Sequence, residues 1–287
     1  QLDGSVTYNQ TEGQPLEYDL DTEIGQAIAN IEGQTVIETG KTNAEVLIED
    51  LALTKVFPLL PNVPLDLTSG RLNADLDVNI PSFEQINDTR IQGDLSLTRF
   101  QAETEQLSQP LNARSRLRFR GERVEIDRTQ ASINDIVARI DGRLNWEKGY
   151  DVSIEVPSFS LSNLLEIIPV QSPIPVAGNI QADFQLTGAI KEPLLTGTIS
   201  NTKPVRLAQT QIQTFNTQLE ASLERVVLEQ LNIVPAAGGK ITGNGILETN
   251  LDRVLAENTE SVTMPLEFEF EAELPAEELL QPYYENS

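Results

Sequence analysis

The residue types that carry most catalytic and metal chemistry are absent from this sequence or dispersed along it. None of its 287 residues is histidine or cysteine, which excludes Ser-His and Cys-His nucleophilic mechanisms and metal sites that use histidine. Paired carboxylates could still hydrolyse glycosides, but the 44 acidic residues are spread along alternating positions and no pair stands out. We therefore predict a chain that is not an enzyme and that holds no metal and no cofactor.

One stretch imitates a calcium-binding loop. Asp75, Asp77 and Asn79 have the spacing of its first ligands. However, Ile80 stands where the loop needs glycine, and Ile86 stands where it needs glutamate. We interpret these residues as the polar side of a strand.

Arginines recur at alternate positions in one part of this otherwise acidic chain. Because a guanidinium binds phosphate through two hydrogen bonds, they could contact lipid phosphates or an acidic partner. We favour the alternative, in which they pair with acidic residues on neighbouring strands. The ladder consists of Arg114, Arg116, Arg118, Arg120, Arg123 and Arg128.

The net charge of −24 excludes a nucleic-acid binder, which needs a basic face to neutralise phosphates. It also disfavours direct adsorption to an anionic membrane surface. No apolar run approaches the roughly 18 residues of a membrane helix. The chain starts at Gln1 and its only methionine is Met264, so we expect an internal piece of a longer protein, with any anchor outside it.

Alternation of apolar and polar residues predicts strands along nearly the whole chain. Ile180, Ala182, Phe184 and Leu186 alternate with polar neighbours, a period of two that is typical of a half-buried strand. Residues 1–48 show the same pattern between glycine turns. Further strands are predicted at residues 71–80, 91–99, 113–119, 123–133, 136–146, 150–156, 204–209, 212–223, 225–234, 239–248 and 265–274.

Two short helices interrupt the strands and belong to a repeated unit. They are predicted at about 51–60 and 159–168, where apolar residues have helical spacing before a proline. Leu53 and Gly70 recur 108 residues later as Leu161 and Gly178. We predict a repeating array with units at 1–48 (partial), 49–156, 157–274 and 275–287 (the start of the next).

The second unit carries a recognisable pattern of glycine, proline and alternating apolar residues. A short amphipathic helix and a proline turn precede Gly178, and Gly188, Pro193 and Gly197 punctuate the following hairpin. This pattern resembles the TamB proteins of the AsmA-like superfamily, which have a chloroplast inner-envelope relative. The resemblance implies an all-β fold with few short helices: an elongated, curved antiparallel β-sheet that forms a repeating hydrophobic groove, or β-taco.

The resemblance also implies a function in a double-membrane cell envelope. The groove would shield phospholipid acyl chains during transport between the inner and outer membranes. The protein would also support assembly of outer-membrane β-barrels with an Omp85-like partner, contacted through other parts of the parent protein. The expected location is the periplasm or intermembrane space, with an inner-membrane anchor outside this fragment.

Each predicted strand has an aliphatic face that must be covered. Burying one aliphatic side chain stabilises by roughly 1.5–3 kcal/mol, so a second sheet or a ligand such as an acyl chain must cover these faces. Trp146 continues the phase of Leu144 and is predicted in the core or the groove wall. The predicted lipid-binding groove residues are Leu72, Ala74, Leu76, Val78, Ile80, Ile140, Leu144, Ile154, Val156, Ile180, Ala182, Phe184, Leu186, Leu266, Phe268 and Phe270.

An alternative function follows from the length of the repeat. A period of 108 residues is close to an immunoglobulin-like domain of about 100 residues. The chain could then be a structural or adhesive rod of tandem β-sandwich domains with no ligand.

Overall fold

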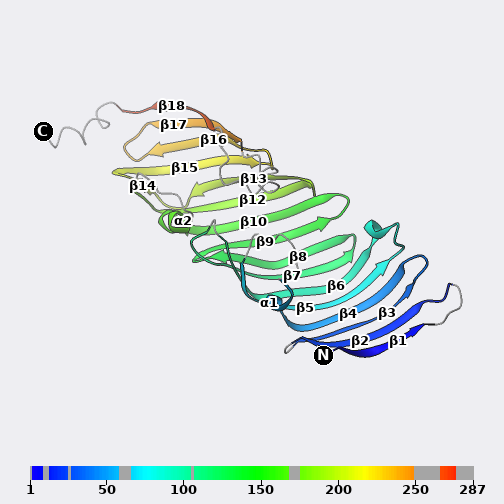
Figure 1. The fold of residues 1–287 in the computed structure, drawn as a ribbon. Coiled ribbons are helices and arrows are strands. Elements are labelled where there is room, and N and C mark those ends of the chain that lie inside the picture. Colours follow the sequence, from blue (N-terminus) through cyan, green and yellow to red (C-terminus); the bar gives the residue numbers. More distant parts are fainter. Residues whose placement is uncertain are drawn as a thin grey trace. The chain divides into compact units, whose positions relative to one another are not determined.

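The computed structural model describes residues 2–8, 13–24, 27–57, 66–104, 107–167, 175–248 and 266–275. Most of these residues lie in antiparallel strands, and short helices are few (Figure 1). The predicted all-β fold class is therefore confirmed. The predicted last unit, 275–287, lies outside the described residues except for Pro275.

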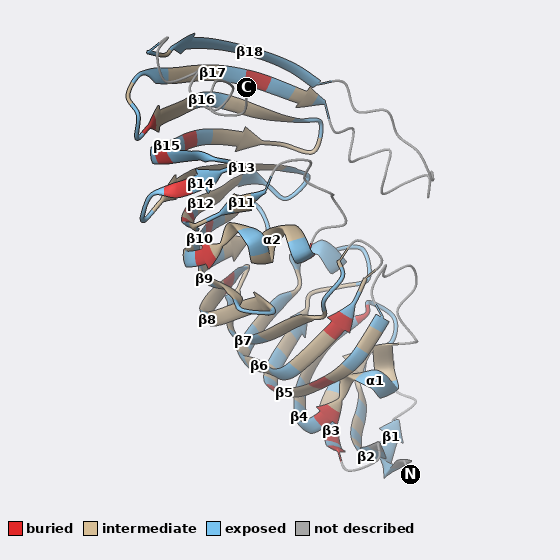
Figure 2. Cartoon of the chain, turned by 90° about the vertical axis from the view of Figure 1, so that its left-hand side faces the viewer, coloured by how far each residue is buried: buried red, intermediate tan, exposed pale blue. Residues whose placement is uncertain are grey.

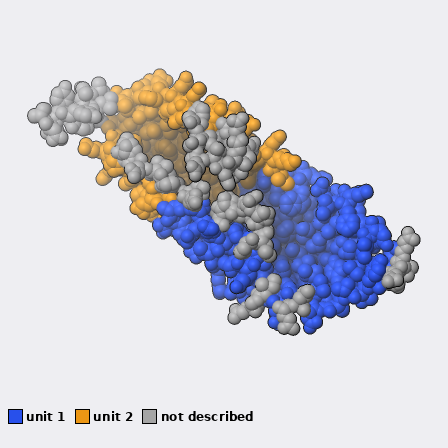
Figure 3. All heavy atoms as spheres, viewed as in Figure 1, with its two compact units in different colours: residues 1–134, 139–152 blue, residues 135–138, 153–287 orange. Residues whose placement is uncertain are grey.

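The chain divides into two compact units, which Figure 3 colours separately. Unit 1 contains residues 1–134 and 139–152, and unit 2 contains residues 135–138 and 153–287. The long segment of unit 2 starts close to the predicted repeat boundary between residues 156 and 157. The division into repeats itself stays a prediction.

Unit 1 is an antiparallel meander in which each strand pairs with the next along the chain. None of the described pairings joins its last complete strand to its first, so this sheet is open. Its elements are β1 (Leu2–Tyr8), β2 (Leu16–Ile24), β3 (Ala27–Val36), β4 (Lys41–Ala52), α1 (Leu53–Val56), β5 (Asp66–Ile80), the 3-10 helix η2 (Ile86–Asp88), β6 (Arg90–Glu103), β7 (Leu111–Gly121) and β8 (Arg123–Ile133). The boundary between the units falls within β9 (Ile136–Asn145) and β10 (Gly149–Ser160).

Unit 2 is also an antiparallel sheet, but one short strand, β14, lies outside the simple strand-to-next-strand order. Its strands pair in the order β12, β13, β15, β16, β17 and β18, and the short β14 pairs with both β11 and β15. The elements are α2 (Leu161–Ile167), β11 (Val176–Ala177), β12 (Asn179–Ala189), β13 (Glu192–Asn201), β14 (Val205–Leu207), β15 (Thr210–Ala221), β16 (Arg225–Pro235), β17 (Lys240–Glu248) and β18 (Leu266–Glu273).

Both helices begin later than the sequence predicts. β4 continues to Ala52, and β10 continues to Ser160. The strands continue there, and they place Leu51 and Phe159 in buried positions. Each helix starts at the next residue, Leu53 or Leu161.

Bulges shift the alternation within several strands of unit 1. Asp50 adopts a φ of 52°, and the register of β4 on β5 shifts between Ile48 and Leu51. Such an extra residue bends the strand and re-aims the side chains that follow. Leu51 thereby reaches the same face as Ile48, although three positions separate them. Arg99 and Arg128 adopt the same left-handed conformation beside register shifts in β6 and β8.

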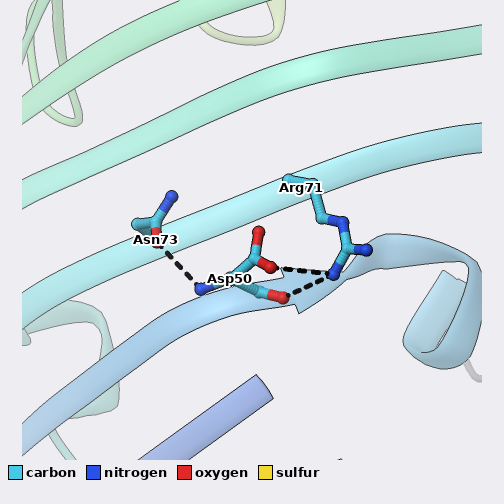
Figure 4. Close-up of polar contacts among 3 residues, drawn as sticks. All are labelled: Asp50, Arg71 and Asn73. Atoms are coloured by element: carbon cyan, nitrogen blue, oxygen red, sulfur yellow. Dashed lines mark hydrogen bonds and ion pairs between the residues drawn. The ribbon is translucent and has the colours of Figure 1, made fainter. Parts of the chain in front are cut away.

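A polar side chain from the adjacent strand satisfies the backbone of the first bulge. The Asp50 amide donates to Oδ1 of Asn73 at 2.8 Å, and Arg71 Nη1 donates to the Asp50 carbonyl at 2.9 Å (Figure 4). The Arg128 amide donates in the same way to Asp141 Oδ1 at 3.1 Å. The bulges are therefore held by specific hydrogen bonds across the sheet.

Deep burial is sparse and is confined to short stretches of the strands. Figure 2 shows buried residues as isolated bands on ribbons that are otherwise half-buried or exposed. A connected cluster of buried residues lies in unit 2. It consists of Phe159, Ile180, Ala182, Val205 and Ile212, with Leu161 and Leu164 of α2 packed against it.

Candidate functional site

The strand register of unit 1 gathers apolar side chains on one side of its sheet, which we call the aliphatic face. Val46 lies opposite Leu76, and Leu76 lies opposite Gly93. Gly93 in turn lies opposite Phe119. Because residues directly opposite one another share a face, this row of apolar residues crosses four strands without interruption. Parallel rows contain Ile48, Ala74, Leu95, Leu117 and Ile126, and Ala44, Val78 and Ile91.

The other side of the same sheet, which we call the polar face, carries the charged residues. Its most regular row consists of Asp19, Glu32, Glu45 and Asp77 on four successive strands. All four side chains are exposed. Leu47 also lies on this face, opposite Asp75, and is 41% exposed. The separation of apolar and polar residues therefore holds across unit 1 with few exceptions.

Unit 2 has an aliphatic face of the same kind. Phe184 lies opposite Gly197, which lies opposite Leu219. At the other end of the sheet, Phe268 and Phe270 lie opposite Gly245 and Gly243. The glycines leave space that the neighbouring aromatic rings occupy, since a Cβ at Gly197 or Gly245 would meet Phe184 or Phe268 within 2.7 Å.

The structure places the predicted groove residues in several separate groups. In unit 1, five of them share the aliphatic face of β5, and Ile140 and Leu144 are half-buried on β9. In unit 2, one group lies on β12, another on β18, and Ile154 and Val156 are half-buried on β10. β13, β15, β16 and β17 separate the β12 and β18 groups in the hydrogen-bonding order.

The predicted set omits much of the face that the structure assembles. Val46 and Ile48 of β4, and Leu95 and Leu97 of β6, belong to the same rows as Leu76 and its neighbours. Their alternation was visible in the sequence. Only the register shows that they share one surface with β5.

The chain's own cover over the aliphatic faces is concentrated near the helices. Leu53 of α1 lies over Gly70, whose Cβ would come within 2.9 Å of the Leu53 side chain. In unit 2, Ile180 lies in the α2 cluster and is only 4% exposed. Phe270 on β18 is 69% exposed. The described chain therefore covers one part of the unit 2 face and leaves another part open.

Trp146 does not lie in a core. It occupies the turn after β9 and is 44% exposed, and its amide donates to the Glu122 carbonyl at 3.0 Å. Of the two predicted positions, the core is therefore wrong, because β9 ends at Asn145 and the turn breaks the phase that Leu144 sets. A position in the groove wall stays a prediction.

The predicted pairing of the arginine ladder with neighbouring strands is confirmed for two of its members. Arg118 of β7 pairs with Asp94 of β6 at 3.3 Å, and Arg120 of β7 pairs with Glu125 of β8 at 3.1 Å. Arg123 and Arg128 pair within β8 itself, with Glu125 at 3.1 Å and with Asp127 at 3.8 Å. Within the described residues, no acidic oxygen lies within ion-pair distance of Arg114 or Arg116.

The described residues show no convergent group of acidic side chains with the geometry of a metal site. None of the helices in the described ranges reaches the length and apolar character that a bilayer crossing requires. Comparison with protein-family models, curated proteins and solved structures gives no match. The resemblance to the TamB family accordingly rests on the residues of this sequence.

Proposed function

We propose that this chain is a non-enzymatic segment of a TamB-like bridge protein. Its aliphatic faces would shield phospholipid acyl chains in transit between the inner and outer membranes. The observation that carries the proposal is the register of unit 1, which keeps aliphatic side chains on one face through successive strands. An acyl chain that crosses the strands would meet aliphatic side chains at each step.

The composition of the face suits acyl chains. Aromatic residues make up 5% of the sequence, so the face consists mainly of Leu, Ile, Val and Ala. Such side chains offer dispersion contacts and few polar groups that would fix a particular ligand. The mechanism is passive: the face replaces the apolar surroundings that the acyl chain leaves, and the headgroup stays in water.

The same proposal sets the cellular context. The parent protein would lie in the periplasm or intermembrane space, anchored to the inner membrane by a segment outside residues 1–287. Support for outer-membrane β-barrel assembly, through an Omp85-like partner, would be a second role of the parent protein.

The alternative function, an adhesive rod, assumed tandem β-sandwich domains, and the described strands do not form sandwiches. In each unit, the described strands form one open sheet, and no described second sheet packs on the aliphatic face as it would in a sandwich. A rod function would need another explanation for the half-buried aliphatic side chains.

Lipid binding by two matched variants tests the proposal. Leu76→Gln changes the aliphatic face, whereas Leu47→Gln makes the same change on the polar face of the neighbouring strand. Native mass spectrometry of the purified chain, after incubation with phospholipid and with circular dichroism as a folding check, measures the bound lipid. We expect Leu76→Gln to weaken binding about tenfold, since a buried leucine contributes roughly 1.5–3 kcal/mol.

Leu47→Gln should leave lipid binding unchanged. A wild-type chain that binds no phospholipid, or equal loss in both variants, would contradict the proposal.

A further inference from the structure

The basic residues of this acidic chain are concentrated in one region. Residues 90–148 contain 11 of the 20 Lys and Arg residues but only 9 of the 44 acidic residues. This region therefore carries a charge of +2, whereas the rest of the chain carries −26. Surface potentials of one sign attract ligands of the opposite sign. The position of the excess thus indicates where an anion would approach.

A hollow of about 710 Å³ on the polar face of unit 1 collects the basic side chains. Arg118 and Arg120 of β7 line it together with Arg90, at the start of β6, and Arg123, at the start of β8. The acidic residues that line the same hollow are Asp94 and Glu122. Four arginines and two acidic residues therefore line this hollow.

The arrangement keeps like charges close together. Arg120 and Arg123 lie directly opposite one another across β7 and β8, and like charges in such pairs are destabilising. Glu125 bridges both guanidinium groups and offsets part of this repulsion. Arg90 has no acidic oxygen within ion-pair distance among the described residues. Its charge is therefore available to a ligand.

We propose that this hollow binds the phosphate group of a ligand, either a lipid headgroup or a free phosphate anion. Guanidinium groups bind phosphate through paired, charge-assisted hydrogen bonds, and four arginines line this hollow. The site lies on the face opposite the aliphatic one, so it is independent of the acyl-chain proposal. Arg90 makes the main contact, because Asp94 already engages Arg118, and Glu125 engages Arg120 and Arg123.

Trp146 provides a reporter for this site. It is the only tryptophan of the chain, it is 44% exposed, and its amide is hydrogen-bonded to Glu122 at the rim of the hollow. Tryptophan emission can therefore follow titrations of the 287-residue chain with pyrophosphate, and with vesicles of phosphatidylcholine with or without phosphatidic acid. Sodium chloride at matched ionic strength corrects for screening.

Two arginine variants distinguish binding at the hollow from nonspecific attraction of anions to positive charge. Arg90→Gln removes a side chain that lines the hollow, and Arg116→Gln removes the same charge from the same face outside it. Neither residue has an ion-pair partner among the described residues, so neither variant leaves an acid unpaired. We expect Arg90→Gln to weaken pyrophosphate binding about fivefold, as one charge-assisted contact is lost from an exposed site. Arg116→Gln should change it less than about twofold.

Each outcome either tests the proposal or identifies the ligand as a lipid phosphate or a free anion. Saturable responses to pyrophosphate and to phosphatidic acid vesicles, both weakened by Arg90→Gln, identify a lipid phosphate, whereas a response to pyrophosphate alone identifies a free anion. The proposal is overturned if there is no saturable response, or if both variants lose binding equally. A response to phosphatidylcholine vesicles that Arg90→Gln leaves unchanged, with no saturable response to pyrophosphate, also overturns it, because that response reports adsorption near Trp146 and not phosphate binding in the hollow.

Discussion

The ring of Phe184 fills the space that Gly197 leaves on the adjacent strand. The two residues lie directly opposite one another in β12 and β13, and a Cβ at Gly197 would lie 2.3 Å from Phe184 Cδ1. The glycine is therefore a packing requirement of the aliphatic face. Phe268 and Gly245 repeat the relationship at the other end of unit 2.

Gly197→Ala should destabilise the chain by about 1–3 kcal/mol, because the added methyl group overpacks the face. Urea unfolding followed by circular dichroism measures the loss. In a double-mutant cycle, Phe184→Leu should recover part of it, since the smaller side chain leaves room for the methyl group. Additive losses would show that the clash lies with the backbone rather than with the ring.

The helix-covered part of the unit 2 face should contribute more to stability than the rest. Ile180→Ala removes a side chain from the α2 cluster and should cost about 2–4 kcal/mol. Leu186→Ala, on the same strand and face but only half-buried, should cost about 1 kcal/mol. Urea midpoints of the two lipid-free variants test this order, and equal losses would mean that Leu186 is covered as well as Ile180.

The bulge at Asp50 should depend on its hydrogen bond from the neighbouring strand. Asn73→Ala removes the acceptor of the Asp50 amide and should lower the free energy of unfolding by about 1 kcal/mol. Gln34→Ala is the control, because Gln34 is exposed on a strand of the same unit and its side chain makes no described hydrogen bond. A loss no larger than that of the control would mean that water replaces Asn73 at no cost.

The acidic row on the polar face should limit stability at low salt. Glu45 lies between Glu32 and Asp77, so Glu45→Lys converts two repulsive pairs into attractive ones. The expected gain is about 0.2–1 kcal/mol per pair, and it should shrink at about 1 M salt, where the Debye length is about 3 Å. Thermal unfolding at both ionic strengths measures it.

Glu38→Lys makes the same charge change in the turn before β4. An equal gain from this variant would assign the effect to net charge rather than to the row.

The sequence alone determined most of the strands and, between the bulges, which residues of a strand share a face. The period of two is a local property, since successive side chains of an extended chain point to opposite sides. The alternation of residues 71–80 and 180–186 therefore predicted β5 and β12 and their aliphatic faces. The same local signals placed the starts of the two short helices to within two residues.

Only the tertiary structure decided which rows those faces form and where the chain covers them. Register is a pairing between distant residues, so it was not visible that Val46 and Leu76 share a row, or that Arg120 stands opposite Arg123. The bulge at Asp50 also escaped prediction, because a hydrogen bond to Asn73, 23 positions away, holds it. Alternation depends on neighbouring residues and is visible in the sequence, whereas the surface that the strands form depends on contacts between distant residues, which exist only in the folded chain.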